Sequence, residues 1–244
     1  MKNLLLFTVL FMVSVVSAQT QRDSITFDPQ KQLNAAQSIL SGNFGKKVTL
    51  GGYGEITYNQ PEALNGELDV QRLVLLVGYK FNDKAQFVTE IEFEHVNEVY
   101  VEQAFVNYSI GDNTSLRGGL MLVPMGIVNE YHEPTTFNGT ERPSIDNVIV
   151  PTTWREIGVG VTGRFPEISL GYQAYVFNGF KSTTPDGEGG VNGVLKGSNA
   201  LRGGRQKAIR STIDSPTLSF KADYYGLPGL RIGLSGYFGS TQAA

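Results

Sequence analysis

The chain has 244 residues, with 20 Lys and Arg against 23 Asp and Glu and a formal net charge of −3. This near balance excludes a basic nucleic-acid-binding surface and an acidic tail, so nucleic acid is not an expected partner. The sequence contains no cysteine, which excludes disulfides, thiolate metal sites and a cysteine nucleophile.

The N-terminus has the pattern of a secretory signal peptide. Lys2 precedes an apolar run from Leu4 to Val16, and Ala18 ends a stretch of small residues that is typical of a cleavage site. The run is shorter than the roughly 20 residues of a membrane-spanning helix. We therefore expect a signal peptide over 1–18 and a polar periplasmic lead-in over 19–47, which has one short helical pattern within 29–40.

Nine strands are predicted after this lead-in. Their lengths, about 9 to 14 residues, exceed the roughly 5 to 6 of soluble sheets and match the roughly 9 to 11 that cross a bilayer at a tilt. The predicted ranges are 48–58, 68–81, 84–95, 99–110, 114–123, 155–165, 167–178, 216–225 and 230–238.

Side-chain alternation gives these strands two different faces. In 84–95, one face carries Phe87, Thr89, Ile91 and Phe93, and the other carries three glutamates. The strands over 48–58, 68–81 and 99–110 alternate less regularly. A sheet in lipid must close to satisfy its backbone groups, which predicts a barrel with an apolar exterior and a polar lumen.

Connection lengths support a membrane barrel. The even connections are short. The four odd connections run to about nine residues (59–67), three (96–98), thirty (124–154) and thirty-seven (179–215), so only one of them is short. Outer-membrane barrels alternate tight periplasmic turns with long external loops and contain an even number of strands. We therefore expect an all-β, antiparallel transmembrane β-barrel of the outer-membrane type over 48–244. It would be incomplete, with nine of an expected total of about 16 strands and its C-terminal part missing.

Four stretches follow one another in the sequence: "SLRGGLMLVPMGIVNEYHEP", "NGTERP", "VIVPTTWREIGVGVTGRF" and "GYQAYVFNGF". With these stretches, residues 48–180 resemble the phosphate-selective porin family of Gram-negative outer membranes, and Pro124, Gly126 and Phe177-Asn178-Gly179 fit the family pattern. It implies a trimer-forming barrel whose long third loop folds into the lumen and narrows it. The lysine that precedes the proline in the family is replaced by Leu122, so phosphate preference does not carry over.

The 124–154 loop is the candidate constriction, because charged rings and pore diameter set selectivity in channels. Its candidate solute-contacting residues are Glu130, His132, Glu133, Glu141, Arg142, Asp146 and Arg155. The lumen-facing strand residues expected to complete the electric field are Glu90, Glu92, Glu94, Arg72, Arg117, Lys221 and Arg231. These charges are of both signs and predict neither anion nor cation preference.

The sequence therefore predicts an outer-membrane porin for passive diffusion of small hydrophilic solutes or ions. The alternative is a plugged barrel that serves as a binding or adhesion scaffold through its long external loops. A metal site at His132 would need the other histidine, His95, to lie close to it. No G-x-S-x-G nucleophile motif occurs. We predict no enzyme activity, catalytic residue, metal or cofactor, and expect outer-membrane lipid, solutes and further copies of the chain in a homotrimer as partners.

Overall fold

The computed structural model describes residues 33–42, 47–198 and 200–243. The expected signal peptide and most of the lead-in lie outside these residues. From Leu33 onward the chain forms one compact unit. None of the helices in the described ranges is long and apolar enough to cross a membrane.

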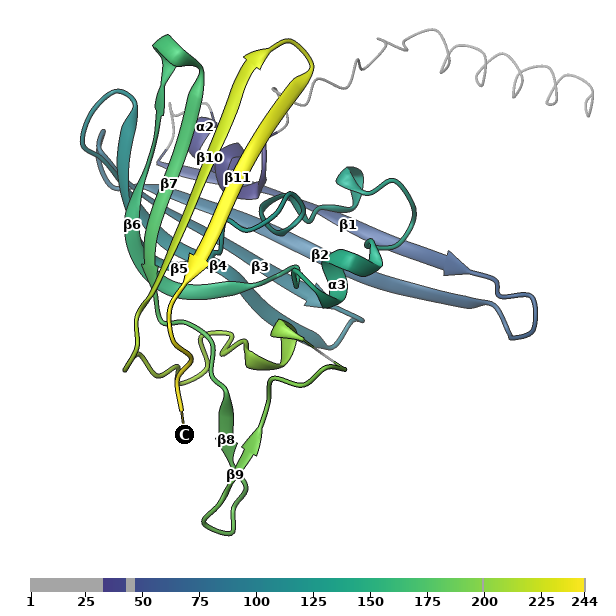
Figure 1. Ribbon diagram of the computed structural model, residues 1–244. Helices are drawn as coiled ribbons and strands as arrows, with labels where there is room; N and C mark the ends of the chain where they lie inside the picture. Colours follow the sequence, from purple (N-terminus) through teal and green to yellow (C-terminus); the bar gives the residue numbers. More distant parts are fainter. Residues whose placement is uncertain (1–32, 43–46, 199, 244) are drawn as a thin grey trace, which may run out of the picture. The chain divides into compact units, whose positions relative to one another are not determined.

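A nine-stranded antiparallel sheet makes up most of this unit (Figure 1). The strands follow one another in chain order across the sheet, except that β10 pairs directly with β7. They are β1 (Val48–Asn59), β2 (Glu67–Lys80), β3 (Ala85–Glu94), β4 (Glu98–Ser109), β5 (Thr114–Leu122), β6 (Arg155–Phe165), β7 (Leu170–Phe177), β10 (Thr217–Leu227) and β11 (Leu230–Phe238). All nine predicted strands are confirmed, with small shifts at their ends.

The largest shift is at the start of β7, which begins at Leu170 instead of residue 167. Residues Pro166–Ile168 form the 3₁₀ turn η3, and Ser169 then adopts a φ of 52°. Proline fixes its own φ and has no N–H to donate to a neighbouring strand. The tight connection between β6 and β7 is therefore longer than the single proline predicted from the sequence.

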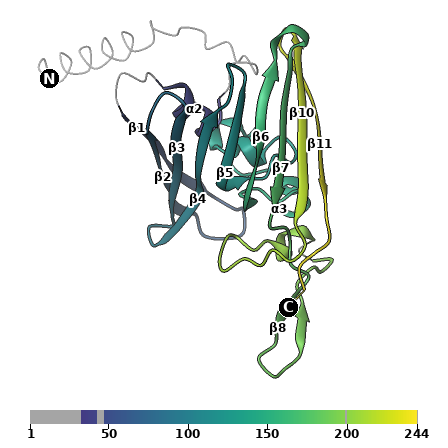
Figure 2. The ribbon, with the colours of Figure 1, turned by 90° about the vertical axis from the view of Figure 1, so that its left-hand side faces the viewer.

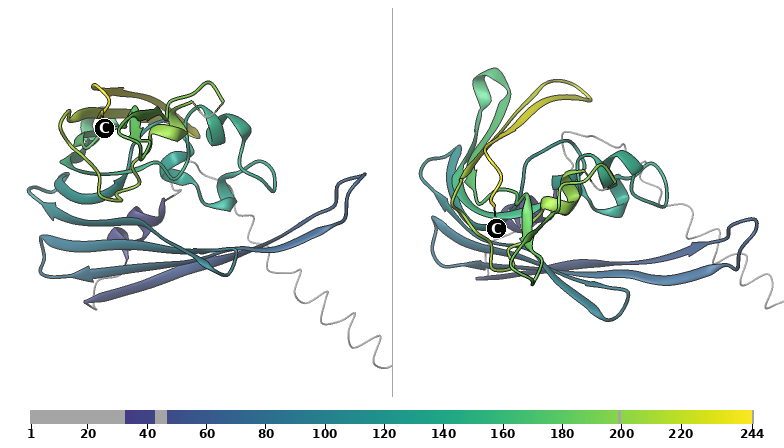
Figure 3. Two further views of the ribbon diagram at one scale, coloured as in Figure 1. Left: turned by 90° about the horizontal axis from the view of Figure 1, so that it is seen from below. Right: turned by 60° about the horizontal axis from the view of Figure 1, so that its bottom comes forward.

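The sheet is strongly curved but open. Figures 2 and 3 show β10 and β11 on the opposite side of the curve from β1 and β2. Among the described residues, the edge strands β1 and β11 do not pair with each other, so these nine strands form no closed barrel. The strand content, the antiparallel order and the nine strands of the sheet agree with what was predicted for this chain, as part of a barrel of about 16 strands.

Three smaller groups of elements accompany the sheet. Helix α2 (Ala35–Ser41) confirms the short helix expected in the lead-in, and Asn34 caps it by accepting the N–H of Gln37 at 2.9 Å. The 124–154 loop contains η1 (Asn129–Tyr131), η2 (Pro134–Thr136) and α3 (Ser144–Val148). The 179–215 connection contains the hairpin of β8 (Thr183–Pro185) and β9 (Val191–Gly193), followed by η4 (Leu201–Gly204).

A limited apolar core lies on the concave side of the sheet, beneath α2 and the two ends of the 124–154 loop. Ile39 of α2 packs over Gly78, where a Cβ atom would overlap the Cγ2 of Ile39. The buried members of this core are Ala36, Ile39, Val88, Phe105, Met121, Val123, Trp154, Tyr175, Phe177 and Phe180.

Candidate functional site

The two faces of the sheet have the reverse of the polarity found in a water-soluble protein. On one face, which we call the polar face, Glu90 and Glu92 are each only 1% exposed. On the other, the apolar face, Leu75 is 42%, Val159 60% and Leu234 68% exposed. Charged side chains are almost never fully buried unless they are paired, so the polar face must supply partners for them.

The pairing register of the strands keeps the polar and apolar faces continuous from one strand to the next. Leu75 lies opposite Ile91 on the apolar face, whereas Leu76 lies opposite Glu90 on the polar face. Further along, Gln173 of β7 lies opposite Lys221 of β10 on the polar face. The structure places all the strand residues expected to face the lumen on the polar face, namely Glu90, Glu92, Glu94, Arg72, Arg117, Lys221 and Arg231.

Ion pairs and hydrogen bonds give several of the charged side chains on the polar face a partner. Arg72 places Nε 2.7 Å from Oε2 of Glu55 and Nη1 2.8 Å from Oε1 of Glu92. Gln103 donates from Nε2 to Oε2 of Glu90 at 2.8 Å. Buried charges are tolerated only when they are paired and hydrogen-bonded, so these contacts allow carboxylates to line the interior of the curve.

A β-bulge in β4 supplies another buried carboxylate. Glu90 lies opposite Gln103 but Ile91 lies opposite Val101, so the intervening Glu102 is an extra residue. Glu102 and Gln103 are both buried, and Arg155 lies with Nη1 2.8 Å from Oε1 of Glu102. Sequence reasoning missed Glu102 because two adjacent residues cannot share a face in a regular strand.

The 124–154 loop folds onto the polar face of the sheet. Oε2 of Glu130 lies 2.7 Å from Nζ of Lys221, and Gln173 donates to Oε1 of Glu130 at 2.9 Å. Arg231 donates to the hydroxyl of Tyr131 at 2.8 Å. Side chains from β7, β10 and β11 therefore hold this loop against the inner surface.

Two further contacts fix the base of the loop and connect it to α2. The side-chain amide of Asn129 donates to the carbonyls of Val123 and Trp154, at 2.7 and 2.9 Å, so it joins the two ends of the loop. Oε1 of Glu133 accepts the backbone N–H of Ala35 at 2.8 Å. Helix α2 is thus tied to the inward-folded loop as well as to the sheet.

Burial changes the ionisation of the loop side chains. Burial alone would raise the pKa of Glu130, but the charge and hydrogen bond of Lys221 hold that pKa below its ordinary value. Burial and the positive charge of Arg142 and Arg72 lower the pKa of His132 to about 3. His132 is therefore neutral. The charge that we expected His132 to contribute to the constriction is absent. Burial raises the pKa of Glu133.

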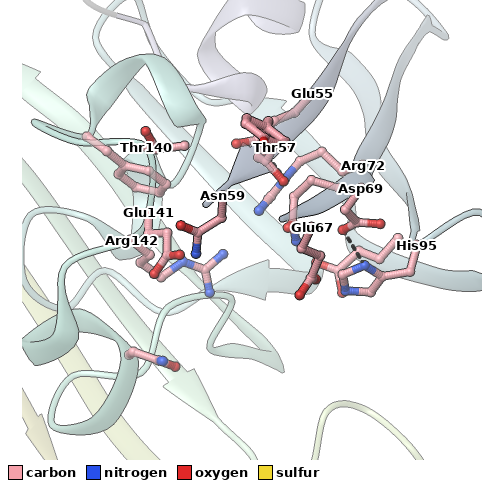
Figure 4. Close-up of a pocket in the computed structure, with 15 residues that line it drawn as sticks. Glu55, Thr57, Asn59, Glu67, Asp69, Arg72, His95, Thr140, Glu141 and Arg142 are labelled. Carbon is pink, nitrogen blue, oxygen red and sulfur yellow. Dashed lines mark hydrogen bonds and ion pairs between the residues drawn. The ribbon is translucent and has the colours of Figure 1, made fainter. Parts of the chain in front are cut away.

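A polar cavity of about 450 Å³ lies between the loop and the ends of the first three strands (Figure 4). Of the predicted loop residues, Glu141 and Arg142 line it, whereas Asp146 in α3 does not. Of the predicted lumen residues, Arg72 and Glu94 line it. The other lining residues are Glu55, Thr57, Tyr58, Asn59, Glu67, Asp69, Gln71, His95, Phe137, Thr140 and Asn147.

The geometry does not favour metal binding at the histidines. No group of three or more His, Asp or Glu side chains in the described part of the chain is arranged to hold a metal ion. Nδ1 of His132 lies 3.2 Å from the carbonyl oxygen of Asn129, and Nδ1 of His95 lies 2.7 Å from Oδ2 of Asp69. Each ring therefore has its own partner.

Arg205, in the 179–215 connection, is a second buried charge that sequence reasoning missed. Its Nη1 donates to the carbonyl of Thr152 at 2.8 Å, which joins this connection to the 124–154 loop. Burial and the nearby positive charges of Arg202 and Arg155 lower the pKa of Arg205 to about 10. It lies in a stretch with no strand or helix periodicity, so nothing in the sequence indicated its burial.

Comparison with known proteins yields few relatives. No family model matches the sequence. A protein of Aquifex aeolicus (strain VF5), described as uncharacterized, is 36% identical over 210 residues, which cover 81% of this chain and 45% of that protein. The chain thus spans about half the length of this relative.

Among the solved structures with weak similarity are two of OmpT, an outer membrane protein of Vibrio cholerae. The loop L8 deletion mutant has a TM-score of 0.31 and 12% identity, covering 80% of this chain and 70% of the OmpT chain. The in-vitro folded trimer form has a TM-score of 0.32 and 11% identity, covering 80% and 66%. TM-scores at this level do not establish a common fold.

Proposed function

We propose that this chain forms part of an outer-membrane β-barrel that acts as a porin for small hydrophilic solutes or ions. The observation that carries the proposal is the reversed polarity of the sheet, which has exposed Leu, Ile and Val on one face and buried ion pairs on the other. Such a sheet suits lipid on its apolar face and a water-filled lumen on its polar face. Additional strands would close the barrel, because an open edge is not stable in lipid.

The 124–154 loop would form the constriction. It lies on the polar face through Glu130 and Tyr131, and its Glu141 and Arg142 line the polar cavity. Solutes would diffuse passively past these charges and past Glu94 and Arg72 of the wall. The resemblance to phosphate-selective porins supports this reading, and with it we propose assembly as a homotrimer in the outer membrane.

A closed scaffold for adhesion is the second candidate function. One observation favours it: α2 and the 124–154 loop both lie on the polar face and are linked by the contact between Glu133 and Ala35. Together they could fill the lumen. The long external loops, including the β8–β9 hairpin, would then meet partners outside the cell.

Conductance in planar bilayers distinguishes the two functions, with protein isolated at its natural length from native membranes. A porin gives ohmic currents, and a plugged scaffold gives none. The double variant Glu94→Gln, Glu141→Gln should shift the reversal potential in a salt gradient toward anions, because it removes fixed negative charge from the path. Low ionic strength maximises the effect. Glu188→Gln on the exposed β8–β9 hairpin is the matched control. Absence of current would overturn the porin proposal.

A further inference from the structure

The polar cavity has the size and position of a solute-binding site in the pore. Its volume of about 450 Å³ falls within the roughly 300–1,000 Å³ of small-molecule sites. The end of β1, the start of β2 and the end of β3 form one wall, and residues 137–147 of the loop form the other. Figure 4 shows Arg142 and Glu141 on the loop side and Glu67, Asp69 and His95 on the strand side.

Some of the charged groups in this cavity are already paired within the protein. Arg72 lies between Glu55 and Glu92, with N–O distances of 2.7 and 2.8 Å. Asp69 is in contact with His95 at 2.7 Å. These groups form part of the wall and do not need a ligand to satisfy their charge.

The remaining charged groups have no ion pair among the described residues. They are three carboxylates, on Glu67, Glu94 and Glu141, and one guanidinium, on Arg142. The Nε of Arg142 is buried without a hydrogen-bond partner. Burial and the neighbouring guanidiniums of Arg72 and Arg202 lower the pKa of Arg142, so an added anion would stabilise its charged form.

We propose that the cavity binds a basic amino acid, a molecule with one carboxylate and two cationic groups. The ligand carboxylate would accept hydrogen bonds from the guanidinium N–H groups of Arg142. The two cationic groups of the ligand would face the carboxylates of Glu67, Glu94 and Glu141. A phosphate or a diacid would add negative charge beside three unpaired carboxylates. A diamine would leave Arg142 without an anion. This inference rests on the proposed porin function and names the solute class of the same site.

Three probe molecules test the charge pattern by isothermal titration calorimetry on detergent-solubilised protein of natural length. They are lysine, pentane-1,5-diamine, which is lysine without its carboxylate, and 6-aminohexanoate, which is lysine without its α-amino group. Lysine should bind roughly tenfold more tightly than either analogue, because each analogue loses one charge-assisted contact. Equal affinities for the three, or no binding of lysine, would overturn the inference.

The Arg142→Gln variant assigns the carboxylate contact. It should reduce the affinity for lysine to that for the diamine, roughly tenfold, and change the affinity for the diamine by less than about twofold. Glu188→Gln should change neither, and the emission of Trp154, the single tryptophan, confirms that each variant is folded. An equal loss for both ligands in Arg142→Gln would contradict the assignment.

Binding in detergent does not require an open pore, so this inference and the porin proposal can fail separately. Ohmic current without preferential binding of lysine would overturn the ligand class and leave the porin function in place. Preferential binding of lysine without current would support the site and overturn passive diffusion.

Discussion

Lysine at Val159, on the apolar face, should destabilise the protein in a bilayer far more than lysine at Thr162, on the polar face of the same strand. Val159 is 60% exposed and lies next to Gly160, the middle residue of β6. In the proposed barrel, one residue along a strand is about 3.3 Å, so at a tilt of about 45° and with β6 centred in the bilayer Val159 would lie roughly 2 Å from the centre of the apolar band. A lysine on the lipid face costs about 2–4 kcal/mol at this depth.

The size of the effect follows from this placement. We expect about 3 kcal/mol for Val159→Lys, which lowers the ratio of folded to unfolded protein by roughly 100-fold. With an m-value of about 2 kcal/mol/M, the urea midpoint falls by roughly 1.5 M. Thr162 lies opposite Gln173, which contacts the loop, so Thr162→Lys places its charge on the polar face and should cost less than about 1 kcal/mol.

Trp154 provides the assay for both variants. It is 1% exposed and stacks on Phe180, with ring centroids 4.6 Å apart, so its fluorescence should change when the protein unfolds. Urea titration of protein refolded into phosphatidylcholine vesicles gives both free energies. If the two variants are equally destabilised, or if Thr162→Lys is the worse, the assignment of the two faces to lipid and lumen is wrong.

Two further predictions concern the polar interior. Glu102→Ala should cost about 3–5 kcal/mol in the same assay, because it leaves Arg155 buried without its partner, and Glu102→Leu with Arg155→Met should recover most of that loss. The pKa of Glu130 is lower in the folded protein than in the unfolded chain. The ionised Glu130 side chain therefore stabilises the loop fully at pH values above the ordinary glutamate pKa. This stabilisation is lost as the pH falls through the lowered pKa of the folded state. Hydrogen exchange at Asn129–Tyr131 should therefore rise only below the ordinary glutamate range, and this pH dependence should be absent in Glu130→Gln.

The strands could be predicted because apolar and polar side chains alternate regularly along them. The features that the sequence did not predict lie where the backbone is irregular. Strand β3 has a strict period of two, so both its range and its faces follow from the residue pattern. Strand β4 contains the bulge at Glu102, which reverses the alternation of the two faces partway along the strand. The residue pattern therefore did not predict that Glu102 is buried in an ion pair with Arg155. The turn before β7 depends on the φ of Ser169, which no residue pattern specifies.

The candidate site was less predictable than the sheet because its charges meet across long sequence distances. The pattern identified Glu130 and Lys221 separately, but only the folded loop brings these two residues, 91 positions apart, to 2.7 Å. The sequence also led us to expect a charge on His132, because the charge of a loop residue is inferred from the residue type alone. In the folded protein, burial decides the protonation state of His132. Arg205 was missed for the same reason, as a loop residue buried by another loop.

The reversed polarity of the sheet also determines which substitutions the protein can accept during evolution. If the apolar face meets lipid as proposed, Leu75 and Val159 need only be apolar, so Leu, Ile, Val and Phe should replace one another freely at such positions. At Arg155, a substitution removes the partner of Glu102, so the two positions should change together. The mutational record would then be the inverse of that of a soluble protein: loosely constrained apolar positions on the surface and tightly coupled polar pairs inside.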